Sequence, residues 1–475
     1  MANILEPDLC VIGGGSGGLS VAAAARAFGS SVVLVEKDKM GGDCLNVGCV
    51  PSKALIAAAK HAHIGQSAKK FGITYKEPKV NFAKVQAHVA NVIAGIAPHD
   101  SVERFEALGA NVINATAKFV DRRTLEANGQ LIRARRFVIA TGSRPAIPPI
   151  HGLNHVPYLT NENIFELKEK PAHLIIIGGG PIGMELAQAH QRLGARVTVV
   201  EMFDPLAKDD PELTAIALRR LQDDGVMVHA NTSVQSVEKT DEGIALTIKA
   251  NDHIEVITGS HLLVAAGRAP NIEALNLEVA HVKSDPQGIF TNKGMRTANR
   301  KIYAIGDVAH GFQFTHTASY QASIVIRSAI FGLPAHQNTN IIPWVTYTDP
   351  EIANVGLNEQ AARKLLGDKF RVVRWSFAEL DRARTERQTE GLAKMIVGKN
   401  GKILGCGMVG PQAGELISLF SFAIANNLKT TSLTKFIAPY PTLSEVARRL
   451  GIESFRDSLS NPWIGRWVNL IRLLP

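Results

Sequence analysis

Residues 9–18 read LCVIGGGSGG, and residues 174–183 repeat this pattern as LIIIGGGPIG. In each copy an apolar run of strand length leads into G-x-G-x-x-G, a helical stretch and a second apolar run. The second run ends on an acid, Glu36 in the first copy and Glu201 in the second. One such glycine motif arises easily by chance, but two complete βαβ units are strong evidence. The repeat therefore predicts an α/β chain with two Rossmann-like dinucleotide-binding domains.

The three glycines of each motif have separate physical tasks. The first allows a tight turn, the second lets the backbone approach a pyrophosphate, and the third lets helix and strand pack closely. The helix N-terminus supplies free N–H groups for the phosphates, and the acid accepts hydrogen bonds from ribose hydroxyls. These predicted cofactor-binding residues are Gly13, Gly15, Gly18 and Glu36 in the first copy, and Gly178, Gly180, Gly183 and Glu201 in the second.

The acid of the second motif also bears on the choice of cofactor. A carboxylate at Glu201 would repel the 2′-phosphate of NADPH, so we expect NADH to be preferred. NADPH stays the alternative, because Lys208 follows nearby in the sequence.

Composition narrows the class of protein. The chain has 475 residues, 45% of them apolar and only 4 of them cysteine, which excludes a disordered chain and a disulfide scaffold. The net charge is +9, but the basic residues form no long run, so we predict no nucleic-acid partner. The N-terminus has no secretory pattern and no stretch is long and apolar enough to span a bilayer, so we expect a cytoplasmic protein.

A pair of cysteines stands in the segment GGDCLNVGCVPSK, residues 41–53. Cys44 and Cys49 precede an alanine-rich helical stretch, whose dipole, together with Lys53, would stabilise a thiolate and allow a dithiol–disulfide cycle. The alternative is a pair of buried packing residues or half of a metal site. Because no second pair of cysteine or histidine residues occurs at zinc spacing, we predict no resident metal. Cys10 and Cys406 are expected to be inert packing residues.

This cysteine segment resembles the redox motif of the flavin-dependent pyridine nucleotide–disulfide oxidoreductases, and the resemblance covers nearly the whole chain. Further family motifs follow in family order: ATG at residues 140–142, GRAPN at 267–271 and TANRKIYAIGD at 297–307. The resemblance implies an FAD domain (1–150), an NAD(P) domain (151–270), a central segment that completes the FAD site (271–340) and a C-terminal α+β dimerisation domain (341–475). It also implies a homodimer that acts on a small-molecule substrate.

The same resemblance implies a relay of electrons. NADH donates hydride to the flavin, and the flavin reduces the disulfide through Cys49, while Cys44 exchanges with the substrate. Lys53 and Glu185 correspond to an ion pair beside the flavin ring. Four further residues match positions that contact the cofactors: Thr141, Gly142, Gly267 and Asp307.

The chain departs from the family pattern near its C-terminus. Disulfide-reducing members of the family carry a histidine base there, contributed by the partner subunit, and a glutamate five residues later. In this chain the glutamate is present as Glu445, but Tyr440 occupies the histidine position. A phenol with a pKa of about 10 is a poor base at neutral pH. A tyrosine at this position resembles mercuric reductases, whose soft metal substrate needs no proton delivered to sulfur.

Two alternatives stay open. Mercuric reductases end in a cysteine pair that is not found in this sequence. The first alternative is therefore a dihydrolipoamide dehydrogenase or another disulfide reductase, in which a residue elsewhere in the chain, such as His316, serves as the base. A flavoprotein NADH dehydrogenase or quinone reductase of the same fold is the second, although it would not need the two cysteines.

The last stretch, NPWIGRWVNLIRLLP (461–475), gathers its apolar residues on one side when it is placed on a helix, with Leu473 as the exception. Trp463 and Trp467 lie within this apolar stripe, and Arg466 and Arg472 lie opposite, a pattern typical of interfacial helices. Packing of this tail against its own dimer is the alternative to peripheral contact with a membrane.

Overall fold

The first glycine motif lies between a buried strand, β2 (Leu9–Ile12), and helix α1 (Ser16–Ala27). The computed structural model describes residues 4–456 and 462–474. Strand β2 is the middle strand of a parallel sheet with the order β20-β8-β2-β3-β4. The other four strands are β3 (Val32–Glu36), β4 (Asn111–Asn114), β8 (Arg136–Ile139) and β20 (Ile302–Ala304).

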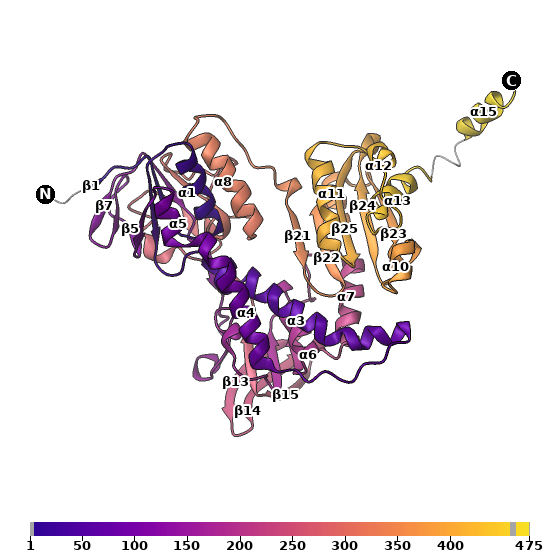
Figure 1. Cartoon of the computed structure of the whole chain (residues 1–475), viewed down its shortest axis with the longest axis horizontal. Coiled ribbons are helices and arrows are strands. Elements are labelled where there is room, and N and C mark those ends of the chain that lie inside the picture. Colours follow the sequence, from indigo (N-terminus) through magenta and orange to yellow (C-terminus); the bar gives the residue numbers. More distant parts are fainter. Residues whose placement is uncertain (1–3, 457–461, 475) are drawn as a thin grey trace.

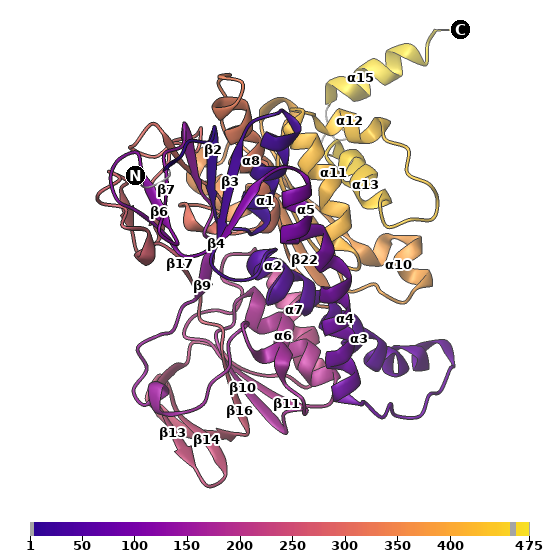
Figure 2. The ribbon, with the colours of Figure 1, turned by 60° about the vertical axis from the view of Figure 1, so that its left-hand side comes forward.

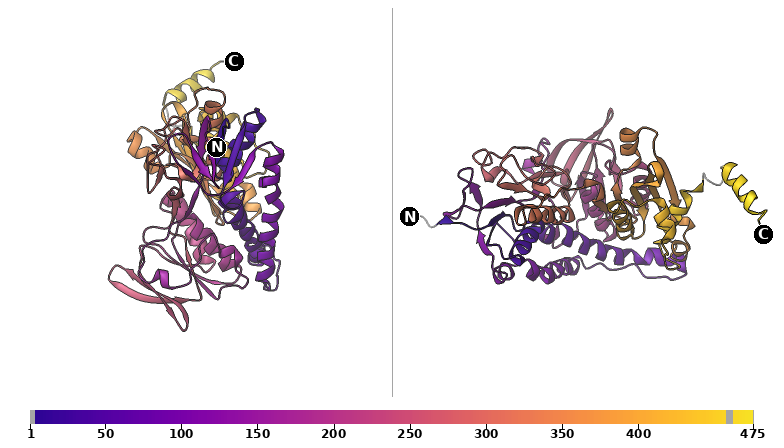
Figure 3. Two further views of the ribbon diagram at one scale, coloured as in Figure 1. Left: turned by 90° about the vertical axis from the view of Figure 1, so that its left-hand side faces the viewer. Right: turned by 90° about the horizontal axis from the view of Figure 1, so that it is seen from above.

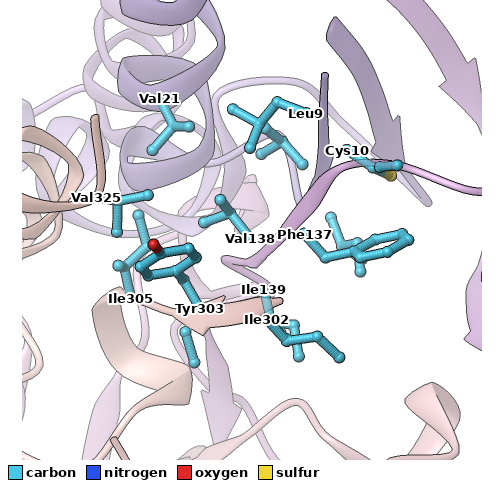
Figure 4. Packing of buried hydrophobic residues seen from close by; sticks show 14 of the residues in the cluster. Leu9, Cys10, Val21, Phe137, Val138, Ile139, Ile302, Tyr303, Ile305 and Val325 are labelled. Carbon is cyan, nitrogen blue, oxygen red and sulfur yellow. The ribbon is translucent and has the colours of Figure 1, made fainter. Parts of the chain in front are cut away.

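The core of this first lobe lies between the sheet and its covering helices. Helix α8 (Thr315–Ala329) packs beside α1, and residues of both helices meet the strands (Figure 4). Because both faces of a parallel sheet are covered, β2 is apolar and buried throughout. Cys10 lies in this strand, and burial raises the pKa of its thiol, as expected for an inert packing residue.

The second glycine motif repeats the same unit. Strand β10 (His173–Ile177), helix α6 (Pro181–Arg192) and strand β11 (Arg196–Val200) form the βαβ unit of a parallel sheet with the order β12-β11-β10-β16. Three antiparallel strands extend this lobe away from the rest of the chain (Figure 1). The remaining strands are β12 (Met227–His229), β13 (Ser233–Thr240), β14 (Gly243–Ala250), β15 (His253–Gly259) and β16 (His261–Val264), and helix α7 spans Pro211–Asp223.

The third lobe is an antiparallel sheet with helices against it (Figure 2). The strand order is β21-β22-β25-β24-β23, and Cys406 is buried in β25. The strands are β21 (Pro343–Thr346), β22 (Glu351–Gly356), β23 (Arg371–Ser376), β24 (Leu392–Val397) and β25 (Ile403–Gly410); the helices are α9 (Glu359–Leu366), α10 (Asp381–Thr385), α11 (Ala413–Ala425), α12 (Thr430–Lys435) and α13 (Glu445–Glu453). The predicted fold class, two Rossmann-like domains followed by an α+β domain, is confirmed.

Two long helices connect the lobes. Helix α3 (Cys49–Ala68) packs against α4 (Phe82–Ile96) and against α6 of the second lobe, and the pair runs along one side of the molecule (Figures 2 and 3). A short helix, α2 (Gly42–Asn46), precedes α3. The first turn of α3 therefore faces the second lobe.

Small elements complete the first lobe. A four-stranded sheet has the order β1-β7-β6-β5, and β9 pairs with β17 where the chain passes between the two nucleotide lobes. Their bounds are β1 (Ile4–Leu5), β5 (Ala117–Phe119), β6 (Leu125–Ala127), β7 (Gln130–Ile132), β9 (Ser143–Pro145) and β17 (Arg268–Pro270), and helix α5 spans Val102–Ala107.

The C-terminal tail contains helix α15 (Pro462–Ile471). Asn461 and Pro475, the first and last residues of the predicted amphipathic stretch, lie outside the described residues. In the part of the chain that the structure describes, no helix combines the length and the apolarity needed to cross a membrane.

Candidate active site

The first glycine of each motif turns the chain sharply out of its strand. Gly13 has φ +110° and Gly178 has φ +113°, a region that favours glycine. A Cβ at Gly18 would collide with the Gly13 carbonyl oxygen, and a Cβ at Gly183 would collide with that of Gly178. Both turns therefore need glycine for the same steric reasons.

The middle glycine of each motif leaves room in front of a helix N-terminus. A Cβ at Gly180 would meet no atom within 4 Å, and one at Gly15 would meet only the Cα of Gly42, at 3.8 Å. Neither α1 nor α6 has a side-chain cap, so their first N–H groups are available to an anion. Both turns can therefore accommodate a pyrophosphate.

The acid that ends each second strand is held by two backbone N–H groups. Glu36 accepts hydrogen bonds from the N–H groups of Gly14 (2.5 Å) and Asp38 (2.8 Å). Glu201 accepts from those of Gly179 (2.6 Å) and Phe203 (2.9 Å) in the same way. Each carboxylate is thus fixed at the carboxyl end of the sheet, where a ribose would lie.

The ATG and GRAPN segments meet across the β9–β17 pair. Thr141 donates from Oγ1 to the Asn271 carbonyl (2.8 Å), and the Asn271 N–H donates to the Gly142 carbonyl (2.9 Å). The Gly267 carbonyl accepts from the N–H of Ala146 (3.0 Å). These bonds hold the two segments together where the chain passes between the first and second lobes.

Asp307 contacts both strands of the β9–β17 pair. Its Oδ2 accepts a hydrogen bond from Ser143 Oγ (2.7 Å) and lies 3.7 Å from Arg268 Nε. Burial raises the pKa of this carboxyl, and the Ser143 hydrogen bond and the Arg268 charge oppose that rise. Arg268 also lies 3.2 Å from Asp43 Oδ1, which ties the β9–β17 pair to the cysteine segment.

The two cysteines stand on consecutive helices. Cys44 is the third residue of α2 and is half-buried, whereas Cys49 is the first residue of α3 and is exposed. Both are free thiols, and Cys49 Sγ lies 3.4 Å from Thr315 Oγ1 at the start of α8. The dithiol is thus held between the first turns of helices from distant parts of the sequence.

The two thiols differ in acidity. A hydrogen bond from Cys44, assisted by Thr315 and by the charge of Lys53, lowers the pKa of Cys49 to about 6, against the effect of burial. The same interaction, together with burial, raises the pKa of Cys44. At neutral pH the reduced pair therefore holds one thiolate, on Cys49, and one thiol.

We expect a titration of the reduced protein to detect this difference. Thiolate ultraviolet absorbance of the wild type, minus that of Cys49→Ser, should rise with pH around a midpoint of about 6, because the thiolate exists above the pKa. Cys44→Ala removes the hydrogen bond from Cys44 and should move the midpoint upwards. A wild-type midpoint at the ordinary thiol value of about 8.5 would contradict this assignment.

An ion pair joins α3 to the second lobe beside the dithiol. Lys53 Nζ lies 2.7 Å from Glu185 Oε2, and Glu185 is buried in α6. The third lobe also contacts the pair, since the Tyr347 N–H donates to Glu185 Oε1 (2.9 Å) and the Tyr347 ring lies 4.4 Å below Lys53 Nζ. A cation over an aromatic face is attracted to it, so Tyr347 positions the ammonium group.

Tyr440 and Glu445, the residues at the positions of the family's C-terminal base and its glutamate, do not contact the dithiol of the same chain. Tyr440 is 71% exposed and donates from its hydroxyl to Asp381 Oδ2 (3.1 Å), a contact that raises the pKa of the phenol. Glu445 is buried at the start of α13, 3.6 Å from Arg449. No hydrogen bond or ion pair connects either residue to the cysteines within residues 4–456 and 462–474.

His316 follows Thr315 on α8 and is exposed. Its Nε2 lies 2.7 Å from the Pro343 carbonyl, and its ring stacks on that of Phe314. One ring nitrogen is therefore engaged by the backbone, and it is the preceding residue, Thr315, that contacts Cys49.

Sequence reasoning missed several side chains at this site. Thr315, Tyr347 and Ser143 contact Cys49, Lys53 and Asp307, respectively, and none of the three carries a signal in the sequence that indicates such a contact. Arg268 stands inside the quoted GRAPN segment, so its position in that motif could have identified it.

Comparisons with known proteins match this geometry along the chain. The family described as "Pyridine nucleotide-disulphide oxidoreductase" matches residues 7–322, and its dimerisation domain matches residues 342–450. A mercuric reductase of Lysinibacillus sphaericus is 35% identical over 92% of this chain and 81% of its own length. A dihydrolipoyl dehydrogenase of Geobacillus stearothermophilus is 34% identical over 93% of this chain and 95% of its own.

A similar structure has also been solved. It is a Cu(II) complex of the HOCl-induced flavoprotein disulfide reductase RclA from Escherichia coli, 25% identical to this chain. The two superpose with a TM-score of 0.84 over 96% of this chain and the whole of that chain.

Proposed function

The chain belongs to the pyridine nucleotide-disulphide oxidoreductase family, and on this basis we propose that its Cys44–Cys49 pair delivers electrons to a soft metal ion held by thiolates, as a mercuric-type reductase would. At the level of the family it is an FAD- and NAD(P)H-dependent disulfide oxidoreductase with a dimerisation domain that supports a homodimer. The metal ion is the substrate and not a resident cofactor.

The first nucleotide site has the features that FAD requires. Gly13, Gly15 and Gly18 with the uncapped helix α1 would hold the pyrophosphate, Glu36 the ribose, and Asp307 the ribityl chain. When bound, FAD accepts hydride from the nicotinamide and passes an electron pair to the disulfide. Lys53, held by Glu185 and Tyr347, would place a positive charge beside the ring and the Cys49 thiolate.

The observation that carries the proposal is the phenol of Tyr440 at the position of the histidine base. The hydrogen bond to Asp381 raises the pKa of this phenol further above its usual value, which makes the group a poorer base for a thiol at neutral pH. Reduction of a dithiolate-bound Hg(II) needs no such proton. NADH supplies two electrons and releases a proton, and the complex releases a metal atom and two thiolates.

The form of the metal substrate follows from the cysteines. No cysteine stands between Cys406 and Pro475, so these residues hold no counterpart of the C-terminal cysteine pair of mercuric reductases. The half-buried Cys44 would therefore take the metal directly from a complex with a small thiol: the Cys44–metal bond replaces one bond to the small thiolate, which leaves with the Cys44 proton. The similar structure of RclA was solved as a Cu(II) complex, which shows that a protein of this fold can bind a metal ion.

A comparison of acceptors tests the proposal. Steady-state NADH oxidation is measured with the Hg(II)–glutathione complex, oxidised lipoamide and glutathione disulfide, each over a full concentration range. The proposal predicts the highest kcat/KM with the Hg(II) complex.

A higher kcat/KM with lipoamide would favour the second candidate, a disulfide reductase. That candidate is supported by His316, which follows the Cys49 contact residue Thr315 in the sequence, and by the dihydrolipoyl dehydrogenase relatives.

We also propose that NADH is the preferred reductant. Glu201 is fixed by two N–H groups, and it is followed by Met202, Phe203 and Asp204, none of which carries a positive charge. We expect kcat/KM to be at least about 10-fold higher with NADH than with NADPH, because like charges repel at close range. Glu201→Gln keeps the shape and should reduce this ratio; a wild-type preference for NADPH would contradict it.

A further inference from the structure

We infer that helix α15 is a docking element for an anionic lipid surface, independently of the substrate proposed above. The apolar residues of the tail, with the exception of Leu473, fall on one side when the helical pattern of α15 is continued to residue 474, and every described residue of the tail is exposed. Trp463 is 73% exposed and Trp467 is 63% exposed. The apolar arc, called here the tail face, consists of Trp463, Ile464, Trp467, Val468, Leu470, Ile471 and Leu474.

The polar side of α15 carries only positive charge. Arg466 lies there with Asn469 and Gly465. Arg472 and one apolar exception, Leu473, follow in the turn after the helix, and residues 462–474 contain no Asp or Glu. The Arg466 guanidinium lies 5.1 Å from the Trp463 ring centroid, at the border between the two sides. Tryptophan at the level of the head groups and arginine towards the phosphates is the arrangement of a helix lying in an anionic interface.

The length of α15 restricts how it can meet a bilayer. A helix over Pro462–Ile471 is about 15 Å long, half the thickness of a hydrocarbon core. The helix therefore lies in the plane of the surface and does not span it. A homodimer would present two such helices, and simultaneous engagement strengthens binding.

Helix α15 lies outside the matched dimerisation domain. The match to the dimerisation domain ends at residue 450, so the tail lies beyond the part that the family uses to form its dimer. Helix α13, which precedes the tail, already buries its apolar residues Val446, Ala447 and Leu450 in the third lobe. In Figure 1 and in the right-hand view of Figure 3, α15 lies apart from the other elements, and Figure 2 shows its near end close to the third lobe.

The test is co-sedimentation of the FAD-loaded full chain with vesicles of phosphatidylglycerol and phosphatidylcholine, and with phosphatidylcholine vesicles alone. We expect binding to the anionic vesicles that falls at high salt and is much weaker on the neutral ones. Trp463→Ser/Trp467→Ser should reduce the partition coefficient at least tenfold, and Arg466→Gln/Arg472→Gln should reduce it on anionic vesicles. NADH oxidation in solution should stay unchanged in both variants.

The matched control replaces two exposed apolar side chains outside the tail. Ile254 and Val256 are exposed on β15, and Ile254→Ser/Val256→Ser should bind vesicles like the wild type. Equal sedimentation of the full chain and of a chain truncated after residue 461 would overturn the inference. Loss of the dimer on truncation, measured by light scattering, would overturn it too and would assign the tail to the dimer itself.

Discussion

Cys44→Ser is expected to abolish reduction of the Hg(II)–thiol complex, lowering kcat by more than about 10³-fold, while leaving FAD bound and reducible by NADH. The serine hydroxyl is neither a soft metal ligand nor half of a disulfide, so no electrons reach the substrate. Cys49→Ser should have an equally large effect, because it removes the thiolate that the interactions with Cys44 and Lys53 stabilise. Steady-state kinetics and anaerobic flavin bleaching measure the two half-reactions separately.

A cysteine outside the pair supplies the control for these variants. Cys406 is buried in β25 of the third lobe, and Cys406→Ala should retain turnover within a few-fold. Full turnover in Cys44→Ser or Cys49→Ser would remove the dithiol from the mechanism. Quinone reduction that persists without Cys44 while Hg(II) reduction disappears would assign the quinone activity to the flavin alone.

Tyr440→His is expected to raise kcat/KM for oxidised lipoamide by about 10²-fold, the usual contribution of general acid–base catalysis. An imidazole with a pKa of about 6.5 can take the proton of the Cys44 thiol and then donate it to the leaving thiolate, whereas a phenol with a pKa of about 10 is a poor base for the first step. The gain should appear as the pH rises through the imidazole pKa, since only the neutral ring accepts a proton. Reduction of the Hg(II) complex should change little.

Tyr440→Phe is the matched control, because it removes the hydroxyl and its hydrogen bond to Asp381 without adding a base. We expect lipoamide reduction in this variant to stay at the low level of the wild type. A large loss of lipoamide reduction in Tyr440→Phe, with no gain in Tyr440→His, would identify the phenol as the working base.

The two nucleotide lobes were predictable from local sequence alone. The turns at Gly13 and Gly178 need glycine for reasons of backbone geometry, and the acids Glu36 and Glu201 end apolar runs at fixed positions after them. Such features lie within one supersecondary unit, where periodicity and turn chemistry dominate. The family resemblance and the fold class are confirmed by the comparisons.

Contacts between units were much less predictable. The approach of Thr315 to Cys49 and of Tyr347 to Lys53 depends on how α8 and the third lobe pack against α3, and no periodicity in the sequence encodes that packing. The amphipathic pattern of the tail predicts a helix, and the structure has helix α15 there. What covers the apolar side of this helix depends on a binding partner, which the sequence of the tail does not identify. Tyr440 and Glu445 lie apart from the cysteines in one chain, as expected if a second copy brings them to the site.

The most direct test of the account is the yield of Hg(0) vapour per NADH oxidised, measured under nitrogen with the wild type, the Hg(II)–glutathione complex and excess glutathione. We expect one Hg(0) per NADH in the wild type and none above background with Cys44→Ser. NADH oxidation by the wild type that releases no Hg(0), or an equal yield of Hg(0) with Cys44→Ser, would contradict it.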